Sequence, residues 1–272
     1  MKAAILQMTG GVEPAANART LVAAVEDAGR AGASMLFTPE MSNIIDRDRA
    51  RAAKAIVAEK DDSVLAAVRE AARLAGVWVH IGSLAVRRDD GRLANRGFII
   101  DAQGGIAARY DKLHLFDVDL ADGQSWRESA SYAAGEHAAI AATPVGTVGM
   151  SICYDLRFAA LYAALSDAGA EVLSVPAAFT RPTGAAHWNV LLRARAIESA
   201  AWVVAAAQTG DHADGRATYG HSLVIDPWGE VGLDMGDAPG LAFADIDPVR
   251  TADVRARIPV LAHRRPIPDV TG

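Results

Sequence analysis

The sequence predicts an α/β protein that folds as a four-layer α-β-β-α sandwich, with two mixed sheets packed face to face. Short apolar runs of strand length alternate with amphipathic helical segments, a pattern typical of βαβ units. The runs are almost continuously apolar, as in residues 77–83, which indicates strands that are buried on both faces. Both halves of the chain contain such units, so we expect two sheets with helices on their outer faces.

Two hairpins indicate that the sheets are mixed rather than wholly parallel. In the first half, residues 97–101 and 106–110 flank a segment with two adjacent glycines. In the second half, residues 222–225 and 231–233 flank a turn that contains proline and glycine. Apolar runs separated by such short turns are typical of antiparallel pairs.

The remaining elements of the first half follow from periodicity and capping residues. We expect strands at 2–8, 34–38 and 77–83, and helices at 17–31 and 63–74. Asn17 and Asp62-Ser63 are the expected N-caps, because their side-chain oxygens can accept from the free N–H groups of a first helical turn.

The second half continues the same alternation. We expect strands at 145–152, 171–176, 202–207 and 241–247, and helices at 156–168 and 186–200. The strand 241–247 is expected to pair with the second sheet. A final helix should begin at Pro248, with Asp247 as its cap.

The composition indicates one globular domain over residues 1–272. The length and the 51% hydrophobic content suffice for one large core. The formal charge of −6 gives no reason to expect nucleic acid or an anionic membrane as a partner. No run approaches the ~18 consecutive apolar residues of a membrane span, and the apolar start breaks before a signal peptide would be complete. We therefore expect a cytoplasmic protein.

Cys153 is the only cysteine, and it lies where a predicted strand meets a predicted helix. Ligands of open α/β sheets bind at the carboxyl ends of strands, and the start of a helix offers N–H groups and partial positive charge that favour a thiolate. A lone cysteine is also commonly a small buried hydrophobe. Context must decide between a nucleophile and a packing residue.

Two further charged residues occupy comparable places. Glu40 follows the predicted strand 34–38, and Lys112 opens a polar stretch that runs to Glu128 without helical or strand periodicity. Long polar segments inside a compact domain are typical of binding or catalytic loops. The aromatic residues Phe116 and Trp126 within this stretch favour burial over a simple solvated loop.

Together these segments resemble the carbon–nitrogen hydrolase (nitrilase) superfamily, whose signature is a Glu-Lys-Cys triad. The matching segments contain Glu40, Lys112 and Cys153, and the resemblance carries the family's second glutamate onto Glu128. It continues to residue 229 in order and at compatible spacing. Within the superfamily the chain is most similar to the Nit branch, and residues 205–208 with 220–222 favour its deaminated-glutathione amidases over its ω-amidases. The chain departs from the family at 158–160, where it has Phe-Ala-Ala and relatives often have Phe-Pro-Glu.

The resemblance implies a mechanism that elementary chemistry supports. Glu40 would act as general base toward Cys153, since an uncharged thiol is a poor nucleophile. Lys112 and the backbone N–H of Tyr154 would form the oxyanion hole. Glu40 would then protonate departing ammonia and activate the water that hydrolyses the thioester, while Glu128 would hold Lys112 or the substrate and tune Glu40. No metal or other cofactor is implied, and the histidines lack ligand spacing.

Substrates of the Nit branch carry a carboxylate remote from the amide, so the pocket should contain a cation. Arg181 is our first candidate, in the loop after strand 171–176 that also contains Phe179. Arg157 is the second, unless it pairs with Asp155 to brace the Cys153 turn. A solvent-facing loop is the alternative for Arg181.

The expected small-molecule partner is an amide substrate. The resemblance also implies a homodimer or larger assembly, formed through the helices that flank Cys153. The triad leaves open which amide is used, so an ω-amidase acting on 2-oxoglutaramate or 2-oxosuccinamate, or another superfamily amidase or nitrilase, is the alternative activity. A non-catalytic binding protein and a papain-like Cys-His hydrolase are less consistent with the complete set of Glu40, Lys112, Glu128 and Cys153.

Overall fold

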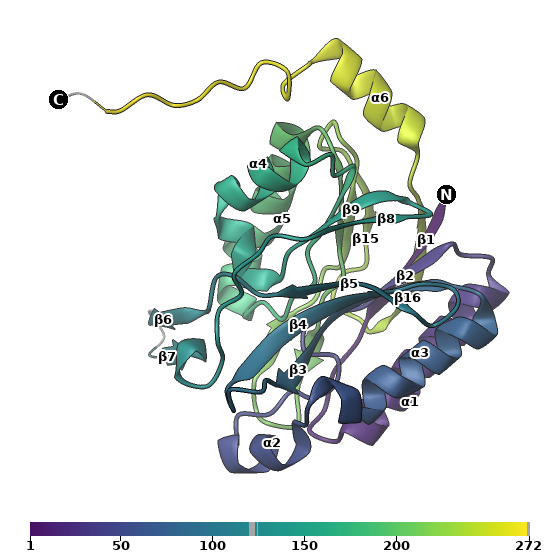
Figure 1. Cartoon of the computed structure of the whole chain (residues 1–272), viewed down its shortest axis with the longest axis vertical. Helices are drawn as coiled ribbons and strands as arrows, with labels where there is room; N and C mark the ends of the chain where they lie inside the picture. The colour runs from purple at the N-terminus through teal and green to yellow at the C-terminus, as the bar shows by residue number, and fades with distance from the viewer. Residues whose placement is uncertain (120–122, 124, 271–272) are drawn as a thin grey trace.

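The computed structural model describes residues 1–119, 123 and 125–270. In this part of the chain two six-stranded mixed sheets pack face to face, and helices cover their outer faces (Figure 1). The α/β class and the layered arrangement predicted from the sequence are confirmed.

The first sheet has the strand order β16-β1-β2-β3-β4-β5. Its parallel centre consists of β1 (Lys2–Gln7), β2 (Met35–Phe37) and β3 (Trp78–Arg87). The predicted hairpin follows as β4 (Leu93–Ile100) and β5 (Ile106–Asp111). Helices α1 (Pro14–Arg30) and α3 (Ser63–Ala75) bury one face each against this sheet.

The second sheet has the order β15-β14-β11-β10-β9-β8. Its strands are β8 (Ile140–Thr143), β9 (Gly146–Met150), β10 (Val172–Ser174), β11 (Trp202–Ala205), β14 (Leu223–Ile225) and β15 (Val231–Asp234). Helices α4 (Ala159–Asp167) and α5 (Arg181–Ser199) cover its outer face.

Smaller elements complete the chain. They are α2 (Arg49–Ala55), the 3₁₀ turns Glu59–Asp61, Glu128–Ala130 and Cys153–Arg157, the ribbons β6 (Asp117–Asp119) with β7 (Ser125–Arg127) and β12 (Thr209–Asp211) with β13 (Ala217–Tyr219), and α6 (Pro248–Arg257). The polar stretch after Lys112 thus contains a short hairpin that its sequence does not suggest. No helix in the described ranges combines the length and the apolar character that crossing a membrane requires.

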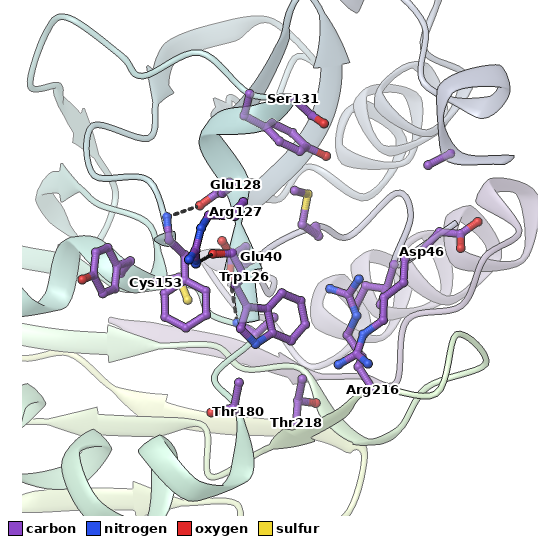
Figure 2. Close-up of a pocket in the computed structure, with 18 of the residues that line it drawn as sticks. Glu40, Asp46, Trp126, Arg127, Glu128, Ser131, Cys153, Thr180, Arg216 and Thr218 are labelled. Atoms are coloured by element: carbon purple, nitrogen blue, oxygen red, sulfur yellow. Dashed lines mark hydrogen bonds between the residues drawn. The ribbon is translucent and has the colours of Figure 1, made fainter. Parts of the chain in front are cut away.

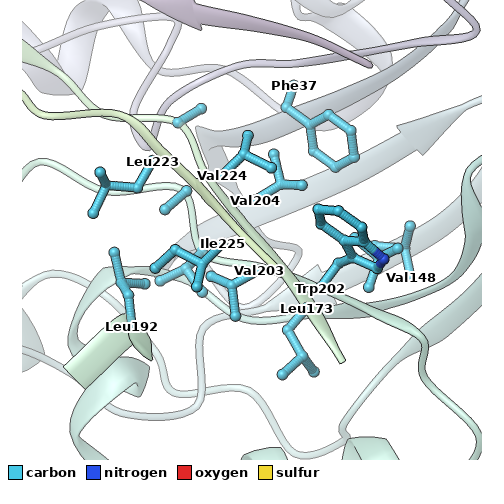
Figure 3. Packing of buried hydrophobic residues seen from close by; sticks show 14 of the residues in the cluster. Phe37, Val148, Leu173, Leu192, Trp202, Val203, Val204, Leu223, Val224 and Ile225 are labelled. Carbon is cyan, nitrogen blue, oxygen red and sulfur yellow. The ribbon is translucent and has the colours of Figure 1, made fainter. Parts of the chain in front are cut away.

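The core between the sheets joins side chains from both. Phe37 of the first sheet belongs to one buried cluster with Val204 and Trp202 of the second (Figure 3). A fully buried side chain of this size contributes about 1.5–3 kcal/mol relative to an exposed one. This packing fixes the carboxyl ends of β2 and β9 relative to each other, and both ends carry residues of the predicted site.

Three expectations about elements are wrong. The strand near the C-terminus, β16 (Gly240–Asp245), pairs antiparallel with β1 in the first sheet and not with the second. Helix α1 begins at Pro14, so Asn17 is not its cap; its buried amide instead bonds the carbonyls of Gly11 and Asn43. Helix α5 begins at Arg181, five residues before the expected start, because Pro182 suits a first helical turn.

Candidate active site

The four predicted catalytic residues meet in one cavity of about 620 Å³ (Figure 2). Glu40 follows β2, Lys112 follows β5, and Cys153 follows β9, while Glu128 begins the 3₁₀ turn after β7. The cavity therefore draws on both sheets. Its size is typical of a small-molecule site.

Lys112 lies between two carboxylates. Its Nζ is 2.9 Å from Glu40 Oε1 and 2.9 Å from Glu128 Oε2, and only 2% of its side chain is exposed. Burying three charges is tolerated because each is paired and hydrogen-bonded. The role expected for Glu128, holding Lys112, agrees with this geometry.

Glu40 is held at both carboxylate oxygens. Oε1 accepts from Asn95 Nδ2 at 2.9 Å as well as from Lys112, and Oε2 accepts from the Ala178 N–H at 2.9 Å. The Cys153 thiol lies near enough to this carboxylate for the charge of Glu40 to raise the pKa of the thiol. Glu40 thus bonds the cation directly and lies beside the nucleophile candidate.

The charges in this network shift the pKa values in opposite directions. Burial raises the pKa of Glu40, but the Lys112 ammonium and three side-chain hydrogen bonds outweigh burial and leave that pKa below its usual value. Burial and the negative charge of Glu40 raise the pKa of Cys153 well above the usual value of a thiol. Burial lowers the pKa of Lys112, but Glu128 and Glu40 together raise it well above normal.

The resting site therefore contains a neutral thiol beside an ionised carboxylate. This corrects the expectation that the helix start alone would favour a thiolate, since Cys153 begins a single 3₁₀ turn rather than a long helix. The Lys112 ammonium lies between the two glutamates, and its charge helps to keep the pKa of Glu40 below the usual value.

Cys153 occupies a strained turn. Its φ of 51° lies in the left-handed region that a residue with a side chain rarely adopts, and its N–H donates to Pro176 O at 2.9 Å. The buried Asp155 braces this turn by accepting from Tyr110 Oη at 2.7 Å and from the Ile152 N–H at 2.9 Å. These bonds hold the thiol at the cavity wall.

The Tyr154 N–H has no hydrogen-bond acceptor within the ranges that the structure describes. It is one of the first amides of the 3₁₀ turn, where N–H groups lack partners inside the helix. With Lys112 it offers two donors beside Cys153, which is the arrangement that an oxyanion needs.

The candidate substrate-binding residues separate into two groups. Arg157 and Phe179 line the cavity, with the Arg157 guanidinium 5.7 Å from the Phe179 ring. Arg157 contacts His187 Nδ1 at 3.3 Å and does not brace Asp155. Arg181 does not overhang the cavity as expected: it is the first residue of α5, is not part of the cavity lining, and lies 3.1 Å from Asp211 on the exposed ribbon.

Asn95 is the site residue that sequence reasoning missed. Its Nδ2 donates to Glu40 Oε1 at 2.9 Å and to Glu128 Oε1 at 3.1 Å, and the residue is 1% exposed. The expected strand began at residue 97, two positions later, so Asn95 appeared to be in a loop. The useful signal would have been a polar residue at the start of an apolar strand, since a buried amide needs partners.

The described ranges contain no group of three His, Cys, Asp or Glu side chains arranged to hold a metal ion. The chemistry available to the site is that of a thiol, a carboxylate base and an ammonium, which together suit acyl transfer to sulfur.

Comparison with known proteins agrees with this chemistry. The model of the carbon-nitrogen hydrolase family matches residues 2–256. The deaminated glutathione amidase of Yersinia enterocolitica is 40% identical over 96% of this chain and 92% of its own, and that of Homo sapiens is 39% identical over 97% and 82%. The crystal structure of the C. elegans NitFhit protein has a TM-score of 0.90 at 38% identity, and this chain covers 65% of that longer protein with 97% of its own length.

The match extends over nearly all of the chain and includes every strand of both sheets. Because the sequence relatives are amidases and the cavity holds a thiol beside a carboxylate base, the chain belongs to the carbon-nitrogen hydrolase family and is an amide-hydrolysing enzyme.

Proposed function

We propose that Cys153 is the nucleophile of an amidase whose substrate carries a carboxylate, with deaminated glutathione as the substrate that the relatives favour. The observation that carries this proposal is the placement of the Cys153 thiol and the Glu40 carboxylate in one cavity that also contains Lys112 and Arg157. The thiol has a candidate base beside it, and the cavity has a cation for the substrate's acid group.

The first half of the reaction forms a thioester. Glu40 takes the thiol proton as sulfur attacks the amide carbon, and the C–S bond forms while the C=O electron pair moves to oxygen. The Lys112 ammonium and the Tyr154 N–H stabilise that oxyanion; loss of one such donor typically costs about 2.7–4 kcal/mol in the transition state. Glu40 then gives its proton to the leaving nitrogen, and the C–N bond breaks.

The second half hydrolyses the thioester. Glu40, again ionised, takes a proton from water as the water oxygen attacks the carbonyl carbon. The C–S bond breaks, and the proton returns to Cys153. Asn95 and Lys112 keep the Glu40 carboxylate in place through both halves.

The leaving group depends on the substrate. Glutathione is γ-glutamyl-cysteinyl-glycine, so its deaminated form contains only secondary amides, and cleavage beside the oxo acid releases the amine of cysteinylglycine. The ammonia expected from the sequence is the product only for a primary amide. Arg157 is our candidate for the carboxylate of the oxo acid, since guanidinium binds carboxylate in a two-pronged geometry.

The second candidate activity is that of an ω-amidase acting on 2-oxoglutaramate or 2-oxosuccinamate. Such a substrate offers the same oxo-acid half to Arg157 but has no peptide on the amine side. The observation in favour of this alternative is that it uses the same Cys153, Glu40 and Arg157, which line one cavity and act on the acyl side of either substrate.

The test is a product assay on wild type and Cys153→Ala. Purified enzyme is given deaminated glutathione and, separately, 2-oxoglutaramate; cysteinylglycine and ammonia are then quantified. We expect faster release of cysteinylglycine, a wild-type acyl-enzyme mass on rapid quench, and no turnover by Cys153→Ala, which should keep its melting temperature. Substantial turnover by Cys153→Ala would disprove the nucleophile assignment, and a preference for 2-oxoglutaramate would favour the ω-amidase.

We also propose a cytoplasmic homodimer that forms through the helices beside Cys153. Val190 and Ile197 on the outer face of α5 are 67% and 51% exposed, which is unusual for large apolar side chains on one helix. Light scattering should give twice the chain mass, and Val190→Glu with Ile197→Glu should give the monomer. An unchanged mass would exclude this surface.

A further inference from the structure

The cavity contains a second cationic group at a distance from Cys153. The guanidinium carbons of Arg47 and Arg216 lie 4.7 and 5.3 Å from the centroid of the Trp126 ring, and all three residues line the cavity. Figure 2 draws Trp126 between Cys153 and Arg216. We call Arg47, Trp126 and Arg216 the distal cleft.

The distal cleft has more hydrogen-bond donors than acceptors. Arg216 uses its Nε toward Asp214 at 2.8 Å, and its terminal nitrogens have no acceptor among the described residues. Arg47 has no carboxylate partner within the same ranges, because the neighbouring Asp46 is engaged by Arg51 at 2.6 Å. Trp126 Nε1 is buried and likewise lacks an acceptor among these residues. An anion would complete this set of donors.

A row of aromatic rings separates the distal cleft from Arg157. The Trp126 ring is 6.0 Å from Phe116, which is 5.1 Å from Tyr154, and the Arg157 guanidinium is 5.8 Å from Tyr154. Tyr154 follows Cys153 directly in the chain. The cavity thus has cations at both ends of an aromatic row, and the reactive thiol adjoins the end where Arg157 lies.

We propose that the distal cleft binds a carboxylate on the amine side of the scissile amide, so that the enzyme selects amides whose leaving amine ends in an acid group. Two guanidinium groups can bind such a carboxylate with several charge-assisted hydrogen bonds, and the Trp126 face restrains both of them. This inference rests on the proposed amidase function and specifies its substrate: an acyl group held by Arg157 and an amine part of peptide length held by Arg47 and Arg216.

The test compares two substrates that differ only at the far end. Deaminated glutathione and its glycinamide form, in which the terminal carboxylate is an uncharged amide, are assayed with wild type, Arg47→Met, Arg216→Met, and Arg181→Met. The methionine variants keep an apolar stem against Trp126. Arg181→Met is the matched control, because that arginine lies outside the cavity lining. Thermal melting checks that each variant is folded.

For wild type we expect the glycinamide to have a KM about 10- to 100-fold higher, which is the usual effect of losing charged hydrogen bonds. Arg47→Met and Arg216→Met should raise KM for the acid substrate by a similar factor and change KM for the glycinamide less than about twofold. Arg181→Met should leave KM unchanged for both substrates. Equal KM values for the two substrates in wild type, or equal increases for both in the variants, would overturn the inference.

A separate binding measurement distinguishes failure of the distal-cleft proposal from failure of the proposed amidase function. If wild type hydrolyses neither substrate, the proposed substrate is wrong, and calorimetric binding of cysteinylglycine and cysteinylglycinamide then decides the role of the cleft. Tighter binding of the acid that is lost in Arg216→Met would support the cleft. Equal binding of both compounds would refute it.

Discussion

At the scale of single residues, Asn95 is the group that connects the two glutamates. One amide nitrogen donates to both Glu40 and Glu128, and its bond to Glu40 lowers the pKa of that carboxyl. In Asn95→Leu the pKa of Glu40 should therefore rise, because a donor to its ionised form is lost. The acid limb of the kcat/KM profile should move to higher pH, with kcat/KM at neutral pH reduced about tenfold or more.

Asn43→Leu is the matched control for Asn95→Leu. Asn43 is also a buried asparagine, but it bonds Asp62 and the Ala85 backbone rather than the glutamates. Asn43→Leu should be less stable than wild type, but the acid limb of its kcat/KM profile should not shift. If both variants keep the wild-type pH profile, Asn95 has only a structural role.

Glu40 has opposite effects on catalysis and on the resting thiol. Its negative charge raises the pKa of Cys153, although burial is the larger cause. In Glu40→Gln that charge is absent while Lys112 remains, so the pKa of the thiol should fall. Amide hydrolysis should decrease by at least about 10³-fold because the base is lost, whereas the midpoint pH for alkylation of Cys153 by iodoacetamide should move down.

The measurement is a pH series of alkylation rates by mass spectrometry beside the amidase assay. Cys153→Ala gives the background rate in both the alkylation assay and the amidase assay. A midpoint that moves up in Glu40→Gln, or does not move, would contradict the coupling between the two groups.

At the scale of elements, Gly82 on β3 lies against the segments that follow β2 and β10, one from each sheet. A Cβ built at this position would lie 2.1 Å from Thr38 O and 2.4 Å from Pro176 Cβ. Thr38 precedes the segment that carries Glu40, and Pro176 O accepts from the Cys153 N–H. Gly82→Ala should therefore move both loops apart and destabilise the protein by about 1–3 kcal/mol or more.

Activity should decrease more than stability explains, because the proposed mechanism needs Glu40 within reach of the Cys153 thiol. Gly232→Ala in β15 is the control, since the nearest atom to its Cβ would be 3.8 Å away. Melting temperature and kcat are compared for both variants. A fully active Gly82→Ala would show that the spacing of these loops is not critical.

How far the sequence predicts an element depends on how local its determinants are. The start of helix α3 was predicted correctly because its determinant is local. The Asp62 side chain accepts from the Leu65 N–H, three residues later in the chain. Glu40, Lys112 and Cys153 could be proposed as site residues because each has its own local motif, and the structure brings the three into one cavity. The strand that pairs with β16 was predicted wrongly. Its pairing with β1 joins residues more than 230 positions apart, beginning with Lys2 and Asp245. Arg181 was misplaced because Pro182 was taken as part of a loop rather than as the start of α5.

At the scale of the whole molecule, the site is a product of sheet packing rather than of any one segment. Glu40 and Lys112 extend from the first sheet and Cys153 from the second, and the apolar core between the sheets determines their separation. No local sequence pattern determines how far Glu40 and Lys112 lie from Cys153. The same reasoning applies to the distal cleft, whose members come from three separate segments: the loop before α2, strand β7, and the turn between β12 and β13.

The pairing of β1 with β16 also has a consequence for folding during synthesis. Strand β1 leaves the ribosome before the other strands of the first sheet. It has β2 on one side, but its other edge is closed only by residues 240–245, more than 230 positions later. Until then an almost fully buried apolar strand presents an open edge that can pair with another chain. Nascent chains stalled before β16 emerges should therefore need chaperones and be protease-sensitive, whereas chains stalled after residue 257 has emerged should resist proteolysis. Equal resistance of the two would show that β1 is protected without its last neighbour.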